Sequence, residues 1–153
     1  MIQKAMFGAG CFWGVQSKFD AIKGVVKTHV GYSGGKTKNP TYDDVCEGDT
    51  EHAEVILIEF DSSKVSYEHL LEIFWKLHDP TQMNRQGPDI GDQYRSVVFY
   101  FSAEQRKIAE KSKQNVQKNF SKKIATIIEP VKEFYKAEEY HQKYNEKNGN
   151  VCY

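Results

Sequence analysis

The stretch Glu54-Val55-Ile56-Leu57-Ile58-Glu59-Phe60 decides how this chain folds. Its centre is an apolar run rich in β-branched side chains, which is typical of a buried strand. Side chains alternate between the two faces of a strand, so Ile56, Ile58 and Phe60 share one face. Glu54 falls in the same register, which predicts a carboxyl group on an apolar face.

Further strands and helices are expected on both sides of this stretch. Cys11 follows the turn Gly8-Ala9-Gly10 and begins a helix. Ser66 is a good N-cap for a second helix, which ends before Pro80. Ser102 begins a third helix, with Gln105 at capping-box spacing. The apolar runs that predict other strands lie at residues 4–7, 27–32, 96–101 and 125–128.

The C-terminal third is less regular. A short helix is predicted over residues 134–144, followed by a polar, mobile tail at about 145–153. Helices and strands alternate loosely along the chain, which favours a two-layer α+β sandwich. A length of 153 residues supports one domain, residues 1–153, rather than two.

Composition excludes several classes of protein. The 21 basic and 21 acidic residues cancel, which argues against nucleic-acid and anionic-membrane partners. A hydrophobic content of 39% excludes a disordered chain. The N-terminus has no secretory pattern, and no window approaches the roughly 18 apolar residues of a membrane span. We therefore expect a soluble cytoplasmic protein. We also expect it to be a monomer.

The three cysteines are Cys11, Cys46 and Cys152, too few for a disulfide scaffold. They either stay reduced and inert, or one or two of them react. A metal-binding module using these thiols and His52 would be an alternative. No Cys-x-x-Cys or His-x-x-x-His spacing supports it, so we expect no metal.

Cys11 lies where a strand turns into a helix. The unpaired N–H groups and the dipole at a helix N-terminus stabilise a thiolate and lower the pKa of the thiol below about 8.5. Phe12 and Trp13 would form an apolar wall beside the sulfur. The alternative is an inert core cysteine among core aromatic residues.

Glu54 is a candidate proton donor. Burial on an apolar face raises the pKa of a carboxyl group, so that it can donate a proton near neutral pH. The alternative is that Glu54 stands at the entrance of its strand and is simply hydrated.

Two tyrosines lie in expected loops, Tyr42 after Asn39-Pro40-Thr41 and Tyr94 after Asp89-Ile90-Gly91-Asp92-Gln93. Loop tyrosines can present hydroxyl donors to a substrate oxygen, although most tyrosines serve packing. Asp89 fits an ordinary turn residue.

These residues stand within a series of short motifs in a fixed order. The series is Gly10-Cys11-Phe12-Trp13-Gly14, Gly31-Tyr32-Ser33-Gly34-Gly35, Asn39-Pro40-Thr41-Tyr42, Val45-Cys46, His52-Ala53-Glu54-Val55, His78-Asp79-Pro80-Thr81-Gln82, Asn84-Arg85-Gln86-Gly87, Gln93-Tyr94-Arg95-Ser96 and Ala137-Glu138-Glu139-Tyr140-His141-Gln142. Over nearly its whole length the chain resembles the peptide methionine sulfoxide reductase A family. The resemblance implies a ferredoxin-like sandwich with a mixed sheet, helices packed on it and an irregular C-terminal region.

The resemblance implies a role for each candidate residue. Cys11 matches the nucleophile, and Glu54 matches the acid that protonates the sulfoxide oxygen. Phe12 and Trp13 match the pocket that holds the methyl group of the substrate. Tyr42 and Tyr94 match the two hydroxyls that bind the sulfoxide oxygen. Asp89 matches a further residue of the pocket.

The resemblance also implies the chemistry. The S epimer of methionine sulfoxide, free or in proteins, is reduced to methionine, and Cys11 becomes a sulfenic acid. Cys152 matches the resolving thiol, and thioredoxin would reduce the resulting disulfide. Cys46 matches a non-catalytic position, with a resolving role as its alternative. No cofactor is implied. Gln16 and Glu51 depart from common family patterns, in which Glu and Gly stand at these positions.

A receptor for oxidised methionine that had lost its chemistry would be a different function. The presence of Cys11, Glu54 and both tyrosines disfavours it.

Overall fold

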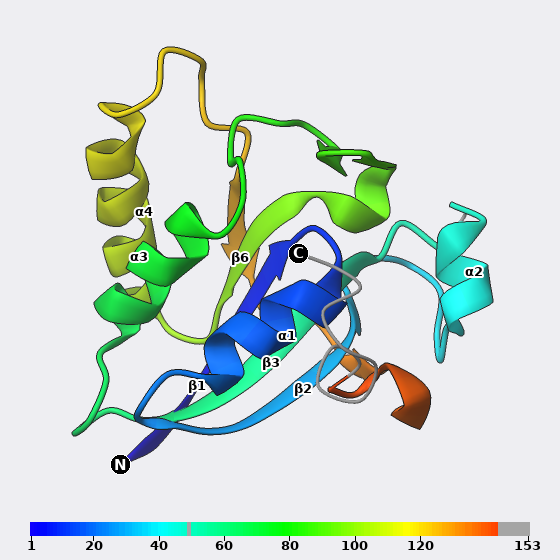
Figure 1. Ribbon diagram of the computed structural model, residues 1–153, viewed down its shortest axis with the longest axis horizontal. Helices are drawn as coiled ribbons and strands as arrows, with labels where there is room; N and C mark the ends of the chain where they lie inside the picture. The colour runs from blue at the N-terminus through cyan, green and yellow to red at the C-terminus, as the bar shows by residue number, and fades with distance from the viewer. Residues whose placement is uncertain (49, 144–153) are drawn as a thin grey trace.

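The expected strand around Glu54 lies in the middle of the protein. In the computed structural model, which describes residues 1–48 and 50–143, it extends over Ala53–Asp61 as β3. β3 pairs antiparallel with β1 (Ile2–Ala9) on one side and β2 (Val25–Ser33) on the other (Figure 1). Its central place explains its continuous apolar run, since both of its faces are covered.

Among the described residues the main sheet has six strands in the order β7-β6-β1-β3-β2-β8. The outer strands are β6 (Ser96–Tyr100), β7 (Ile127–Pro130) and β8 (Tyr135–Lys136). β6 and β7 run parallel and the other neighbours antiparallel, so the sheet is mixed as predicted. The inner order β6-β1-β3-β2 is ferredoxin-like.

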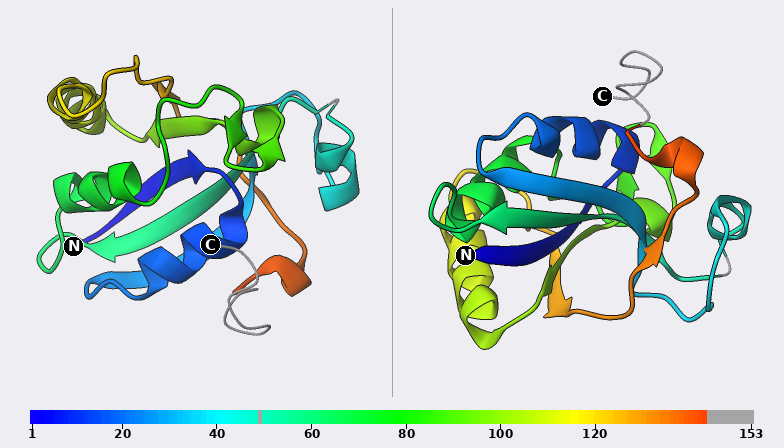
Figure 2. Two further views of the ribbon diagram at one scale, coloured as in Figure 1. Left: turned by 45° about the horizontal axis from the view of Figure 1, so that its top comes forward. Right: turned by 90° about the horizontal axis from the view of Figure 1, so that it is seen from below.

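Helices cover one face of this sheet (Figure 2). α1 (Phe12–Asp20) and α3 (Tyr67–Lys76) contribute to one core cluster, and α4 (Ala103–Gln117) packs against α3. Phe7, Phe19 and Phe74 meet in its centre, with ring centroids of Phe7 at 5.7 Å from Phe19 and 5.0 Å from Phe74. The opposite face has a smaller cluster made of Met6, Ala53, Val55, Val97 and Phe99, with Leu57 and Phe134 packed against it.

The predicted helix caps form. The Ser66 side chain accepts the N–H of His69 at 3.1 Å, and the Ser102 side chain accepts the N–H of Gln105 at 3.2 Å. The second cap is not a reciprocal box. The side-chain oxygen of Gln105 accepts the N–H of Phe101 instead, and its side-chain nitrogen donates to the backbone carbonyl of Lys4.

Three sequence predictions are wrong or shifted. Tyr42 does not lie in a loop, because it begins the short helix α2 (Tyr42–Cys46), which Thr41 and Asp44 cap reciprocally. Tyr94 ends the 3₁₀ helix η1 (Asp92–Tyr94), which follows the hairpin of β4 (Arg85–Gln86) and β5 (Asp89–Ile90). The strand expected at 125–128 begins at Ile127.

The predicted helix at 134–144 is also wrong. β8 and the 3₁₀ helix η2 (Glu139–His141) occupy this region instead. The edge of β2 has backbone groups that pair with an extended segment and not with a helix. Ala137 N–H donates to the Val30 carbonyl at 2.9 Å. The Gln142 side chain accepts the Val30 N–H and donates to the Val30 carbonyl. The expected tail at 145–153 lies outside the described residues. Within residues 1–48 and 50–143, no helix is long and apolar enough to cross a membrane.

His78 is held in its neutral form by its surroundings. Burial is the main cause that lowers its pKa from 6.5 to about 4. Its Nδ1 lies 2.7 Å from the Phe74 carbonyl oxygen, and its Nε2 lies 2.7 Å from the Ser96 hydroxyl. A carbonyl only accepts, so Nδ1 carries the proton and Nε2 accepts from Ser96.

This gives a testable effect on stability. As pH falls, the unfolded chain binds a proton at His78 near pH 6.5, whereas the folded protein binds it only near pH 4. We expect the free energy of unfolding to fall by about 3 kcal/mol over this interval because of His78. His78→Gln should flatten the slope of the free energy of unfolding against pH, measured by urea titrations. An unchanged slope in His78→Gln would contradict this account.

Candidate active site

The thiol of Cys11 lies at a turn from strand to helix, as expected. β1 ends at Ala9, Gly10 takes a φ of +91°, and Cys11 is the N-cap of α1. Positive φ favours glycine, which explains Gly10 at this turn. Cys11 is 8% exposed, so its sulfur lies just below the surface at the positive end of the helix dipole.

The carboxyl group of Glu54 lies at the same helix end. Phe12 N–H, the first of α1, donates to Glu54 Oε1 at 3.2 Å, and Gln93 Nε2 donates to Oε2 at 2.8 Å. Glu54 is 2% exposed, so it is buried and not hydrated at the entrance of its strand. The residue after Cys11 therefore binds the candidate acid directly.

The two predicted hydroxyls belong to phenols that stay protonated. Burial is the main cause that raises the pKa of Tyr42, followed by its hydrogen bond with Cys46 and the charge of Glu54. Burial also raises the pKa of Tyr94, and the charges of Glu54, Asp89, Cys46 and Cys11 add to it. A phenol that keeps its proton throughout the neutral range can donate a hydrogen bond to a substrate oxygen.

An aromatic wall stands beside the thiol. Phe12 is buried, and its ring centroid lies 6.5 Å from that of Tyr42. The ring of Trp13 stacks with Tyr42 at 6.2 Å, and the ring of His141 lies 4.4 Å from Tyr42. Such a wall suits a small apolar group such as a methyl.

The segment 137–143, which we call the C-terminal strap, runs beside the N-terminal end of α1 (Figure 2). Trp13 Nε1 donates to His141 Nδ1 at 2.9 Å. The Glu138 carboxylate accepts the Tyr32 hydroxyl at 3.3 Å and the N–H of Tyr42 at 3.1 Å. The strap thus sets the position of both Trp13 and Tyr42.

The structure brings together Cys11, Phe12, Trp13, Tyr42, Glu54, Asp89 and Tyr94, and Cys152 lies outside the described residues. Cys46 also lies beside the site, with its sulfur 3.6 Å from Gln93 Nε2. Sequence reasoning did not single out Gln93, Glu138 or His141. Their membership in two of the quoted motifs was the available signal. Polar residues in irregular segments follow no period that shows where their side chains point.

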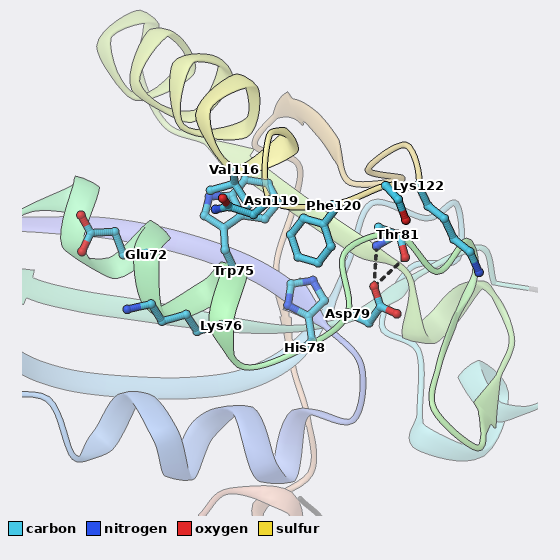
Figure 3. Close-up of a pocket in the computed structure, with 11 residues that line it drawn as sticks. Glu72, Trp75, Lys76, His78, Asp79, Thr81, Val116, Asn119, Phe120 and Lys122 are labelled. Atoms are coloured by element: carbon cyan, nitrogen blue, oxygen red, sulfur yellow. Dashed lines mark hydrogen bonds between the residues drawn. The ribbon is translucent and has the colours of Figure 1, made fainter.

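A separate hollow lies between α3 and the end of α4 (Figure 3). It has a volume of about 730 Å³, and Trp75, His78 and Phe120 are among its lining residues. None of the predicted site residues lines it. Among the described residues, no three His, Cys, Asp or Glu side chains form a group that could hold a metal ion.

A ferredoxin-like α+β fold, with a thiol at a helix N-terminus beside a buried carboxyl group and protonated phenols, is typical of a cysteine-dependent enzyme. Comparison with known proteins identifies which one. The family model described as peptide methionine sulfoxide reductase matches residues 3–153. The chain belongs to this family and is a peptide methionine sulfoxide reductase.

Individual proteins of this family are similar to the chain in sequence and in structure. Over 148 residues the chain is 57% identical to peptide methionine sulfoxide reductase MsrA of Methanothermobacter thermautotrophicus, covering 95% of this chain and 88% of the relative. The structure of reduced Mxr1 from Saccharomyces cerevisiae superposes with a TM-score of 0.93 at 39% identity, covering 99% of this chain and 88% of that one. Mxr1 in complex with Trx2 is also similar, with a TM-score of 0.68, 25% identity and coverage of 99% and 86%.

Substitution of Gly31 tests whether the position of the C-terminal strap depends on its packing against β2. A Cβ atom at Gly31 would lie 2.3 Å from the Tyr135 carbonyl oxygen and 2.7 Å from the Phe134 ring. We expect Gly31→Ala to displace β8 and lower the free energy of unfolding by about 1–3 kcal/mol, as overpacking does. Because the strap holds Trp13 and Tyr42, KM for a methionine sulfoxide peptide should rise as well.

The matched control is Gly48→Ala. Gly48 has a φ of +87°, and a Cβ atom added there would meet nothing within 4 Å, so only local backbone strain of about 1 kcal/mol is expected. A Gly31→Ala variant with the KM of the unmodified protein would show that the strap does not depend on this contact.

Proposed function

We propose that this enzyme reduces the S epimer of methionine sulfoxide, free or in proteins, with Cys11 as nucleophile and Glu54 as proton donor. The observation that carries the proposal is the contact of Glu54 with the first N–H of α1, immediately after Cys11. It brings an acid and a thiol to one point, from strands and helices far apart in sequence.

The site supports a division of roles. The Tyr42 and Tyr94 hydroxyls would bind the sulfoxide oxygen, and Glu54 would deliver a proton to it, which makes the sulfur electrophilic. Phe12 and Trp13 would hold the methyl group. Asp89, whose charge contributes to the raised pKa of Tyr94, would help to hold the substrate. The site would need both polar and apolar groups because the sulfoxide has a polar oxygen on one side and an apolar methyl group on the other.

The reaction balances without a cofactor. The Cys11 thiolate attacks the sulfoxide sulfur and forms an S–S bond while the oxygen is protonated. The resulting hydroxyl group then moves to the Cys11 sulfur, so the S–S bond and the S–O bond of the substrate break as an S–O bond to Cys11 forms, and the bonding electrons stay on the methionine sulfur. Methionine leaves reduced, and Cys11 remains as a sulfenic acid. A second thiol then displaces water from the sulfenic acid and forms a disulfide, which an external dithiol reduces.

Cys152 is proposed as that second thiol. The last described residue, Lys143, is anchored on α1: its N–H donates to Gln16 Oε1 and its Nζ to Asp20 Oδ2, both at 2.6 Å. The nine residues that follow Lys143, up to and including Cys152, can span up to roughly 30 Å. α1 rises only about 7.5 Å from Cys11 to Gln16, so the tail is long enough to reach the thiol.

A thioredoxin-type dithiol is the proposed reductant. The similarity to Mxr1, whose structure includes a complex with Trx2, supports it. Cys46 remains the competing resolving thiol, since it lies beside the site. We expect the enzyme to act as a monomer in the cytoplasm.

Glu54→Gln tests the proton donor. Loss of a general acid typically costs a factor of 10² to 10⁴, so the single-turnover rate of methionine formation from an S-sulfoxide peptide should fall about 100-fold or more. Glu59→Gln, at a half-buried glutamate of the same strand, is the control and should keep the rate. Wild-type rates for Glu54→Gln at neutral pH would exclude Glu54 as the donor.

Cys152→Ser tests the relay. With dithiothreitol the variant should keep its activity, because a small dithiol can reduce the sulfenic acid directly. With thioredoxin it should lose most of its turnover. Cys46→Ser is the matched control and should keep both activities. If Cys46→Ser lost thioredoxin-supported turnover and Cys152→Ser kept it, the roles of the two thiols would be reversed.

A further inference from the structure

Gln93 has no role in the proposed reaction, yet its amide lies in the centre of the site. It is 5% exposed and belongs to η1, next to Tyr94. Its Nε2 donates to Glu54 Oε2 at 2.8 Å and to Cys46 Sγ at 3.6 Å. Both hydrogens of one amide nitrogen are therefore directed at groups of the active site.

We propose that Gln93 is a positioning residue, which aims the Glu54 carboxyl group at the substrate oxygen and sets the pH range in which Glu54 can donate its proton. The inference rests on the proposed role of Glu54 as acid. Gln93 itself would not touch the substrate.

The two oxygens of Glu54 are held from two different elements. Oε1 is held by a backbone N–H of α1 and Oε2 by a side chain of η1. A second donor on the other oxygen restricts the turning of the carboxyl plane about the backbone contact. The neighbouring Tyr94 enters from the same short helix. η1 thus places one oxygen-binding hydroxyl and orients the acid together.

The chemistry of an amide suits this position. A lysine or arginine here would favour the carboxylate strongly and suppress proton donation. An apolar side chain would leave a buried carboxyl oxygen without this donor, which is costly. A neutral amide supplies a moderate donor, so Glu54 can still bind and release its proton. The sulfur of Cys46 accepts the second hydrogen, which supports the orientation of the amide with its nitrogen toward Glu54.

The pH dependence of the single-turnover reduction step distinguishes positioning from mere structural support. Glu54→Gln first identifies which limb of the pH–rate profile depends on Glu54, as the limb that this variant removes. A hydrogen-bond donor favours the charged form of a carboxyl group, so deleting the donor favours the protonated form. In Gln93→Met, which keeps length but has no donor, that limb should move to higher pH by about one unit. The maximal rate should fall about tenfold.

Gln105→Met is the matched control. Gln105 is 6% exposed and donates to Lys4 at 2.8 Å, but it lies on α4 and not in the site. This variant should lose stability yet keep the pH profile. Gln93→Glu should also move the Glu54-dependent limb to higher pH, because two carboxyl groups in contact cannot both ionise easily.

The outcomes separate the two proposals. If Glu54→Gln removes no limb, Glu54 is not the acid and the proposed function fails. If Glu54→Gln removes a limb that Gln93→Met leaves in place, the acid stands and the role of Gln93 is overturned. A Gln93→Met variant that is too unstable to assay leaves Gln93→Glu to decide, and an unmoved limb in that variant also overturns the inference.

Discussion

The hydrogen bond from Phe12 N–H to Glu54 is the contact on which the site depends. It joins the start of α1 to the start of the central strand β3, across 42 residues of sequence. A helix N-terminus needs acceptors for its unpaired N–H groups, and a buried carboxyl group needs donors. One contact satisfies both requirements, and it places an acid next to a thiol.

The rest of the fold maintains this contact. β3 is held between β1 and β2, so its register, and with it the height of Glu54 in the sheet, is set on both sides. η1, which precedes β6, contributes the Gln93 side chain that binds Glu54, and the C-terminal strap holds Trp13 and Tyr42. Segments from three parts of the chain, α2, η1 and the C-terminal strap, lie toward the same end of the sheet (Figure 1).

Local signals predicted the regular elements well. The apolar run at 54–60, the turn before Cys11 and the cap at Ser66 each depend on neighbouring residues, and each forms as expected. The region 134–144 has no such local determinant. Its conformation depends on the exposed edge of β2, which hydrogen-bonds with Ala137 and Gln142, so a helix prediction from local pattern fails there.

The sequence by itself determined the family, the main strands and the three longer helices, and the candidate thiol, acid and tyrosines, because short motifs and strand alternation depend on neighbouring residues. Only the tertiary structure decided that Glu54 is buried rather than hydrated, that Cys46 lies beside the site, and that Gln93, Glu138 and His141 support it. These are contacts between distant segments, and the burial that gives them their strength arises only when the segments pack together.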